Sequence, residues 1–122
     1  MIIAIDHAQI TIPKNAETEA REFYCGLLKL REIPKPAALA GRGGFWLEVG
    51  DKQLHIGTED DVDRVKTKAH VAYEVADLDE CREILSDAGI PVHDGVQISG
   101  MRRFEFRDPF GNRIEFLERS NR

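Results

Sequence analysis

The pattern of hydrophobic and polar positions is clearest near the end of the chain, where residues 103–107 and 112–118 each alternate with a period of two. Such a period predicts two strands, each with one apolar and one polar face. The residues between them favour a tight turn, because an Asp-Pro pair is typical of turns and Gly111 or Asn112 can adopt a positive φ. The pattern therefore predicts a hairpin that carries Glu115 on its polar face.

The first half of the chain predicts a similar succession of elements. Its helix is recognised by apolar residues at helical spacing, and its loop by two prolines and three glycines. In order, we expect a strand at residues 2–12, a helix at 16–28, a short segment at 30–33, a mobile loop at 34–44, and a hairpin of 45–49 with 53–57.

The second half follows a charged stretch, residues 58–68, which we interpret as a solvated linker. Asp77 and Glu80 form a capping-box pattern before a helix, and Gly89 is typical of the end of that helix. Leu78, Cys81, Ile84, Leu85 and Ala88 are its predicted buried stripe. The other elements expected in this half are a strand at 69–75, a strand at 92–96, a loop at 97–101 and the hairpin described above.

Each half thus has the order strand, helix, strand, strand, strand, which indicates an internal repeat. His7 and His70 lie in the opening strands of their halves, 63 residues apart. Residues 45–47 correspond to 104–106, and with one extra residue in the second turn His55 corresponds to Glu115. These four residues, whose imidazole and carboxylate groups can bind a metal ion, therefore form two pairs, one in each half, at matching positions.

Composition and charge narrow the classes of protein. A chain of 122 residues with 42% hydrophobic and 32% charged residues is typical of one compact soluble domain. The net charge of −5 and the absence of a basic stripe argue against nucleic acid as a partner. No apolar stretch is long enough for a membrane span, and residues 1–5 lack the features of a signal peptide. We therefore expect a cytoplasmic protein, with Cys25 and Cys81 as reduced packing residues.

Two motifs carry a resemblance to a known family: RDPFGNRIEF at 107–116, and HVAYEV at 70–75 followed by Asp77-Leu78-Asp79. With them the chain resembles the vicinal oxygen chelate superfamily, which includes glyoxalase I, bleomycin-resistance proteins, fosfomycin-resistance enzymes, methylmalonyl-CoA epimerases and extradiol dioxygenases. The resemblance implies an α+β fold of two tandem βαβββ modules that form a cup-shaped mixed sheet. It places a single domain over 1–122, with module one at about 1–58, a linker at about 58–68 and module two at about 69–120. It also implies a homodimer, in which chains can share a site.

Carried over from this family, the metal ligands lie on the first and last strands of each module and are His7, His55, His70 and Glu115. The residues on the opposite face of each strand are apolar, for example Ala8 and Ile10 opposite His7 and Ile114 and Phe116 opposite Glu115. All four ligands are therefore expected on the face away from the helices. Imidazole and carboxylate donors suit a divalent transition metal, and Zn, Ni, Mn, Co and Fe all remain open. A single histidine on a strand is usually structural, and it is the matching of the two pairs that favours a site.

The ligand set leaves several chemistries open. Glyoxalase I usually has a carboxylate where this chain has His55, which weakens a proton transfer that uses a displaced carboxylate. A triad of His7, His70 and Glu115 would suit Fe(II) dioxygenation or a Mn-dependent thiol transferase, with His55 as a fourth ligand or a base. Catalytic roles are therefore predicted for Glu115 and His55.

Substrate contacts are predicted for three further residues on the same faces of their strands. Arg103 and Arg107 would bind a carboxylate or phosphate, or else form a solvated ladder of cross-strand charge pairs. Trp46 would stack on a planar ligand or fill the cavity wall. The loop at 34–44 would act as a lid or as a plain connector.

Three functions are compatible with these residues. The first is a small metal-dependent enzyme of glyoxalase type, a lyase or isomerase that binds vicinal oxygens of a small-molecule substrate. The second is a dioxygenase or thiol transferase that uses the same site. The third is a metal-free protein that sequesters a ligand, as bleomycin-resistance proteins do.

Overall fold

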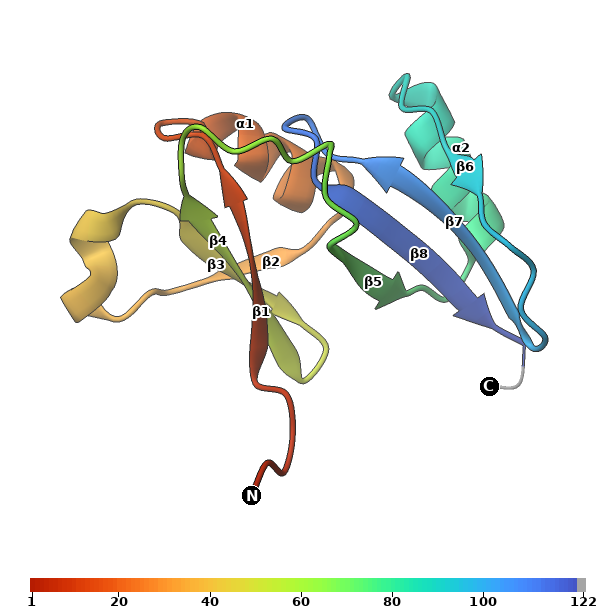
Figure 1. Ribbon diagram of the computed structural model, residues 1–122, viewed down its shortest axis with the longest axis horizontal. Coiled ribbons are helices and arrows are strands. Elements are labelled where there is room, and N and C mark those ends of the chain that lie inside the picture. Colours follow the sequence, from red (N-terminus) through yellow and green to blue (C-terminus); the bar gives the residue numbers. More distant parts are fainter. Residues whose placement is uncertain (121–122) are drawn as a thin grey trace. The chain divides into compact units, whose positions relative to one another are not determined.

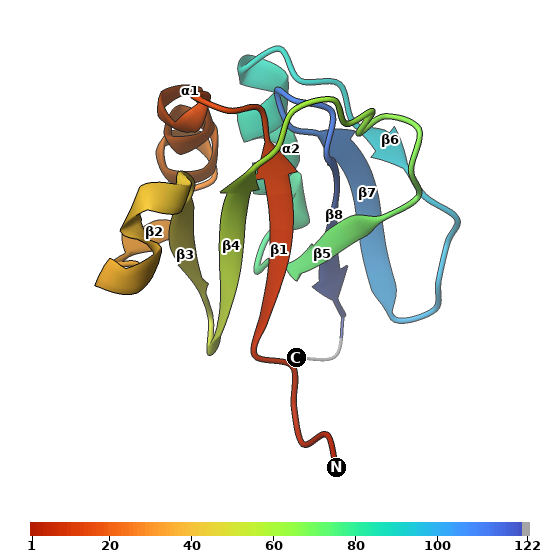
Figure 2. The same cartoon turned by 60° about the vertical axis from the view of Figure 1, so that its left-hand side comes forward.

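The computed structural model describes residues 1–120 and divides the chain into two compact units, one over Met1–Val62 and one from Asp63 onwards. Each unit contains one four-stranded mixed sheet and few helical segments (Figures 1 and 2). This confirms the predicted fold class of two βαβββ modules.

The sheet of the first unit has the strand order β1-β4-β3-β2. β1 is parallel to β4, and the other pairs are antiparallel (Figure 2). The helix α1 continues into a wider π-helical turn, in which the Leu28 N–H bonds to the Phe23 carbonyl at 2.9 Å. The elements are β1 His7–Ile12, α1 Glu17–Arg21, a π-helical segment Glu22–Leu27, β2 Arg31–Ile33, a 3-10 helix Ala37–Arg42, β3 Phe45–Val49 and β4 Lys52–Thr58.

The sheet of the second unit has the equivalent order β5-β8-β7-β6, again with its first and last strands parallel. Figure 1 shows the long strand β8 between β5 and β7. The predicted cap of α2 is present, because the Asp77 side chain accepts from the Glu80 N–H at 3.0 Å. The elements are β5 His70–Glu74, α2 Leu78–Asp87, β6 His93–Asp94, β7 Met101–Arg107 and β8 Arg113–Arg119.

Strand register supports the internal repeat. Trp46 pairs with His55 in the first unit, and Glu105 pairs with Glu115 in the second. Glu105 lies 59 residues after Trp46 and Glu115 lies 60 residues after His55, so the second hairpin turn is one residue longer. The opening strands also match, because His7 pairs with Gln53 and His70 with Arg113.

Alternation along the strands separates a buried apolar face from a polar face in each unit. In the second unit Phe104, Phe106, Ile114 and Phe116 are buried, with Phe104 fully inaccessible to solvent. Burial of such side chains is worth about 1.5–3 kcal/mol each, so the apolar face fixes which side chains point the other way. The corresponding buried strand residues in the first unit are Phe45, Leu47, Leu54 and Ile56.

The predicted final turn is also present. Asp108 is buried, and its Oδ1 accepts from the backbone N–H groups of Phe110 at 2.9 Å and Asn112 at 2.8 Å. Gly111 takes the positive φ, at 100°. The turn therefore fixes the register that pairs Glu105 with Glu115.

Several predicted boundaries were wrong. The first strand begins at His7, not at residue 2, because its register places His7 opposite Gln53 and β4 itself begins one residue earlier, at Lys52. The segment before β1 therefore lacks a strand to pair with, and Ile2 and Ile3 are exposed. The strand expected at 92–96 shrinks to His93–Asp94, the two residues that pair with β7.

Burial also differs from expectation at two places. In the predicted stripe of α2, Leu78 and Leu85 are buried, whereas Ile84 and Ala88 are exposed. The stretch at 58–68 is not wholly solvated, because Arg64 is buried and its carbonyl accepts from Arg107. Within residues 1–120, no helix has both the length and the apolar character that a membrane span requires.

The segment at 34–44 contains the 3-10 helix and is fixed at its end by close backbone packing. Gly44 has a φ of 78°, and a Cβ there would lie 2.0 Å from the Ile56 carbonyl oxygen. The Gly44 N–H also donates to the Glu17 carboxylate at 3.1 Å, a bond that lowers the pKa of Glu17. This close approach attaches the segment to β4.

We expect Gly44→Ala to lower the free energy of unfolding by about 2–4 kcal/mol, because it adds both backbone strain and a clash with a carbonyl. Urea unfolding of the variant measures this loss. Gly41→Ala is the matched control, since a Cβ at Gly41 meets nothing within 4 Å. Equal stability of the two variants would contradict the close packing of Gly44 on β4.

Candidate functional site

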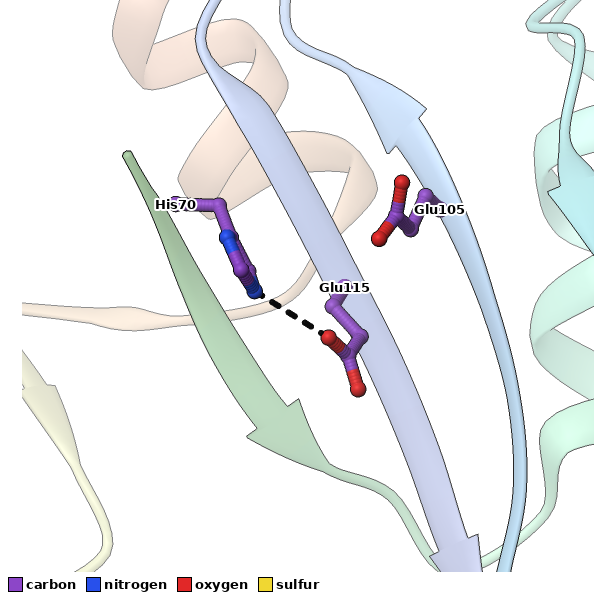
Figure 3. A group of neighbouring side chains, drawn as sticks. All are labelled: His70, Glu105 and Glu115. Atoms are coloured by element: carbon purple, nitrogen blue, oxygen red, sulfur yellow. Dashed lines mark hydrogen bonds and ion pairs between the residues drawn. The ribbon is translucent and has the colours of Figure 1, made fainter. Parts of the chain in front are cut away.

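The second unit brings together one imidazole and two carboxylates from three neighbouring strands. His70 lies on β5, Glu115 on β8 and Glu105 on β7 (Figure 3). All three alternate along their strands with buried or half-buried apolar residues and so lie on the opposite face of the sheet. One potential ligand atom of each lies within 4.8 Å of those of the other two. Imidazole nitrogen and carboxylate oxygen form a donor set that suits Zn and other divalent transition metals.

The two ring nitrogens of His70 both face acceptors. Its Nδ1 lies 3.0 Å from the Lys68 carbonyl oxygen, and its Nε2 lies 3.2 Å from Glu115 Oε1. A carbonyl only accepts, so the proton of a neutral ring sits on Nδ1 and leaves a lone pair on Nε2. Either a second proton or a metal ion at Nε2 then satisfies the contact with Glu115.

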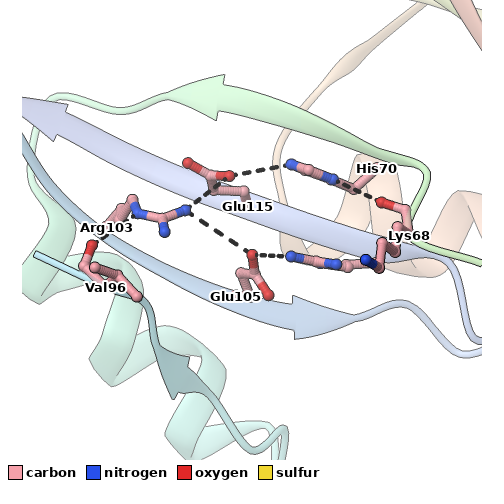
Figure 4. A network of polar contacts seen from close by, with 7 residues as sticks. Lys68, His70, Val96, Arg103, Glu105 and Glu115 are labelled. Carbon is pink, nitrogen blue, oxygen red and sulfur yellow. Dashed lines mark hydrogen bonds and ion pairs between the residues drawn. The ribbon is translucent and has the colours of Figure 1, made fainter. Parts of the chain in front are cut away.

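Two arginines, Arg103 (Figure 4) and Arg113, balance the negative charge of the carboxylates. Arg113 donates to Glu105 at 2.6 Å, and this bond lowers the pKa of Glu105. Arg103 Nη1 lies 3.3 Å from Glu115 Oε1 and 4.0 Å from Glu105 Oε1. The buried Glu115 is therefore kept next to a cation rather than left unpaired, which would be costly.

The guanidinium of Arg103 is held in position from its other side. Its Nε donates to the Val96 carbonyl at 3.2 Å (Figure 4). It also packs on Gly95, where a Cβ would lie 2.8 Å from the Arg103 Cζ. The loop after β6 thus directs Arg103 towards the two carboxylates.

The first unit has an aromatic stack at the equivalent strand positions. The His55 ring lies between Trp46, with ring centroids 3.8 Å apart, and His7, with centroids 3.9 Å apart. The two interplanar angles are 3° and 16°. His55 is buried at 6% exposure, and desolvation together with the neighbouring His7 lowers its pKa, so the neutral ring is favoured.

His7 is oriented by a carboxylate. Its Nδ1 lies 2.9 Å from Asp6 Oδ2, and this contact lowers the pKa of Asp6. A carboxylate oxygen only accepts, so in a neutral ring the proton lies on Nδ1 and Nε2 carries a lone pair. A carboxylate on the far nitrogen is the arrangement that commonly orients metal-binding histidines.

Of the seven predicted site residues, all but Arg107 lie in two groups on the polar faces of their sheets. The first unit brings together His7, His55 and Trp46, and the second brings together His70, Glu115 and Arg103. Arg107 instead donates to the backbone carbonyls of Gly111 at 2.9 Å and Arg64 at 3.4 Å. Its predicted contact with substrate stays a prediction.

Sequence reasoning missed Glu105 as a member of the cluster. The available signal was its place on the alternating strand, opposite Glu115, between two phenylalanines that are buried. A cross-strand pair of two acids is destabilising unless cations accompany it, and Arg103 and Arg113 are those cations.

A sequence profile of the Glyoxalase/Bleomycin resistance protein/Dioxygenase superfamily matches residues 4–116. The chain belongs to this superfamily. No protein with a curated description matches it.

Solved structures of the superfamily extend this comparison. A protein from Bacillus anthracis described as of the glyoxalase family is 43% identical, with a TM-score of 0.90 over 98% of this chain and 97% of that one. A lactoylglutathione lyase from Agrobacterium tumefaciens is 20% identical, with a TM-score of 0.72 over 94% and 92% of the two chains. A variant of the fosfomycin resistance protein FosX from Listeria monocytogenes, complexed with Mn(II) and 1S,2S-dihydroxypropylphosphonic acid, is 18% identical, with a TM-score of 0.75 over 100% and 93%. At such identities the last two show the shared fold.

The lowered pKa of His55 predicts that the stability of this protein, in the absence of metal, depends on pH. The unfolded chain takes up the His55 proton near pH ~6.5, whereas the folded chain does so only at lower pH. The free energy of unfolding should therefore fall as the pH is lowered below about 6.5 and be fully restored above it.

Urea unfolding at several pH values, with a chelator present, measures this effect. We expect a smaller fall in His55→Gln and an unchanged fall in the control His93→Gln, which replaces an exposed histidine. The same pH dependence in wild type and His55→Gln would show that burial of His55 does not shift its protonation.

Proposed function

We propose that the chain is a metal-dependent enzyme of glyoxalase type, a lyase or isomerase that binds vicinal oxygens of a small-molecule substrate. The observation that carries the proposal is the orientation of His70, whose Nδ1 faces the Lys68 carbonyl while its Nε2 faces Glu115. In a neutral ring this leaves a nitrogen lone pair beside a carboxylate, which a divalent cation would satisfy.

The spacing of the His70 and Glu115 donor atoms fits such a cation. Ligand atoms about 2.1 Å from a metal ion and at neighbouring coordination positions lie roughly 3 Å apart. His70 Nε2 and Glu115 Oε1 are 3.2 Å apart, and Glu105 offers a third oxygen within the 4.8 Å spread of the cluster. FosX, which shares the fold, binds Mn(II), and the same donor set accepts Zn, Ni, Co and Fe.

A bound cation would polarise two adjacent oxygens of a substrate and stabilise the negative charge that develops on them. The residues of this chain supply the remaining steps. Glu115 is buried and adjacent to His70, and we assign it the movement of a proton to or from a substrate carbon. Arg103, which contacts Glu115, is directed to the same region and suits an anionic substrate oxygen.

The predicted roles of the first unit belong to the same proposal. Neutral His55 is suited to act as a ligand or as a base, and His7 has its Nε2 available. Membership of the superfamily also supports a homodimer in the cytoplasm. Mixing His7→Ala chains with Glu115→Ala chains tests whether chains share a site, because shared sites would recover part of the activity.

A different candidate is a protein that sequesters a ligand without metal. One observation favours it: Arg103 and Arg113 already compensate the charge of Glu115 and Glu105. Because these arginines already balance the carboxylate charge, a metal ion would stabilise the cluster less. Dioxygenase or thiol transferase chemistry at the same metal remains the alternative within the enzyme proposal.

Elemental analysis of the purified protein tests the proposal directly. We expect near-stoichiometric transition metal in the wild type and its loss in His70→Ala/Glu115→Ala, because the variant lacks two donors. His93→Ala, at an exposed position outside the cluster, should keep the metal. His7→Ala/His55→Ala tests separately whether the first-unit pair belongs to the predicted ligand set.

The metal that is found distinguishes the candidate reactions. Ni or Zn would favour glyoxalase-type isomerisation, which turnover of a hemithioacetal would then test, whereas Fe would favour dioxygenation and Mn transfer. A wild-type protein without metal, even after incubation with Zn, Ni, Co, Mn and Fe(II), would leave the ligand-sequestering candidate.

Arg103 provides a second test, because it competes with a cation for Glu115. Arg103→Gln should raise the affinity for the metal roughly three- to tenfold, since it removes a positive charge 3.3 Å from a ligand oxygen. Competition with a chromogenic chelator measures the affinity. Arg102→Gln, which removes an exposed arginine paired with Asp79, is the control, and weaker metal binding in Arg103→Gln would contradict the competition.

A further inference from the structure

The first unit contains a cavity of about 780 Å³ beside the aromatic stack. Its wall includes His7, Trp46 and His55 from the sheet and Lys35, Leu39 and Arg42 from the segment at 34–44. Cavities of about 300–1,000 Å³ with a few directed polar groups are typical of sites for small organic ligands. The volume therefore suits an organic molecule larger than a bare inorganic ion.

The charge of the lining is biased towards cations. Lys35 and Arg42 are its basic residues, and Asp6 is its single acid. The Asp6 carboxylate is already bonded to His7, at 2.9 Å. Two basic residues against one acid leave the lining with an excess positive charge, which favours an anionic group on the ligand.

The two cations retain donors for a ligand. Lys35 Nζ donates to the Gly43 carbonyl at 2.7 Å, which uses one of its three protons. Within residues 1–120 the guanidinium of Arg42 makes no hydrogen bond or ion pair. A guanidinium binds a carboxylate or a phosphate through two parallel bonds, so Arg42 is suited to be the main contact.

Their placement is specified by the fold, although they lie in a segment that the sequence predicts to be mobile. The Lys35 contact with Gly43 joins the two ends of the segment, and Gly44 is pressed against β4. The Gly44 N–H is also bonded to Glu17 on α1. These contacts reduce the ordering cost that ligand binding would otherwise carry.

We propose that this cavity binds an organic anion, with Arg42 and Lys35 holding its carboxylate or phosphate and Trp46 contacting its carbon skeleton. The identification of this anion as the substrate rests on the proposed function, whereas its binding does not. Binding is therefore measured on the metal-free protein, so that loss of the metal site and loss of the anion site give different results.

Trp46 is the single tryptophan of the chain, and its emission reports on the cavity directly. The probes are phenyl phosphate, benzoate and benzyl alcohol, which share an aromatic ring and differ in the charged group. In the wild type we expect saturable quenching by at least one of the two anions. In Arg42→Gln the same anion should bind about tenfold more weakly, because a charged hydrogen bond is lost. Benzyl alcohol should bind at least tenfold more weakly than that anion.

Lys35→Gln should weaken binding less than Arg42→Gln, because Lys35 is partly engaged by Gly43. Arg102→Gln, in the other unit, is the charge-matched control and should bind as the wild type does. Calorimetry with the same probes detects binding even where the emission does not change. Saturation by phenyl phosphate alone would identify a phosphate site, and saturation by benzoate a carboxylate site.

Two results would overturn the proposal. One is the absence of saturable binding of both anions by calorimetry in the wild type. The other is binding of equal affinity in wild type and Arg42→Gln, which would assign the anion to another place. Both are measured on the metal-free protein, so neither depends on whether the purified protein contains metal.

Discussion

The parallel pairing of the first strand of each unit with its last strand is the constraint on which the rest of the structure depends. His70 and Glu115 are 45 residues apart in sequence, and they meet because β5 and β8 run side by side. Parallel neighbours need a crossover connection, which α2 and the strands β6 and β7 supply. In the first unit the same pairing of β1 with β4 brings His7 to His55.

Strand alternation then determines what each polar side chain can do. The apolar face fixes orientation, since a slip of one residue would expose Phe104 and Phe116 and bury their charged neighbours. The consequence is that Glu115 becomes buried on the opposite face, where an isolated carboxylate would be unfavourable. His70 and Arg103 remove that penalty, so the requirements of folding and those of cation binding converge on the same contacts.

The sequence was sufficient for the order of elements, for the repeat and for the equivalence of the His55 and Glu115 positions, because these depend on local periodicity and on turn residues such as Asp108 and Gly111. The fold class itself came from the family resemblance that the motifs at 70–79 and 107–116 carry. It was insufficient where pairing decides the outcome. Nothing local in residues 2–6 shows that β4 begins at Lys52 and leaves them without a partner. Glu105 was overlooked for a related reason, since its role depends on the residue across the strand pair and on two arginines. The aromatic stack also needs three dimensions, because Trp46 and His7 come from strands on either side of β4.

The two units use one backbone frame for different chemistry. Equivalent register positions hold Trp46 and Glu105, His55 and Glu115, and Gln53 and Arg113. The first member of each pair is uncharged or favours its neutral form, and the second is charged. A stack of flat rings beside a cavity is suited to an organic surface, whereas two carboxylates around an imidazole are suited to a cation. Because the fold is repeated but the side chains are not, one short chain can offer both an organic-binding surface and a cation-binding cluster. In the first unit the segment between β2 and β3 adds Lys35 and Arg42 to the cavity lining, so the organic ligand that suits this surface is an anion.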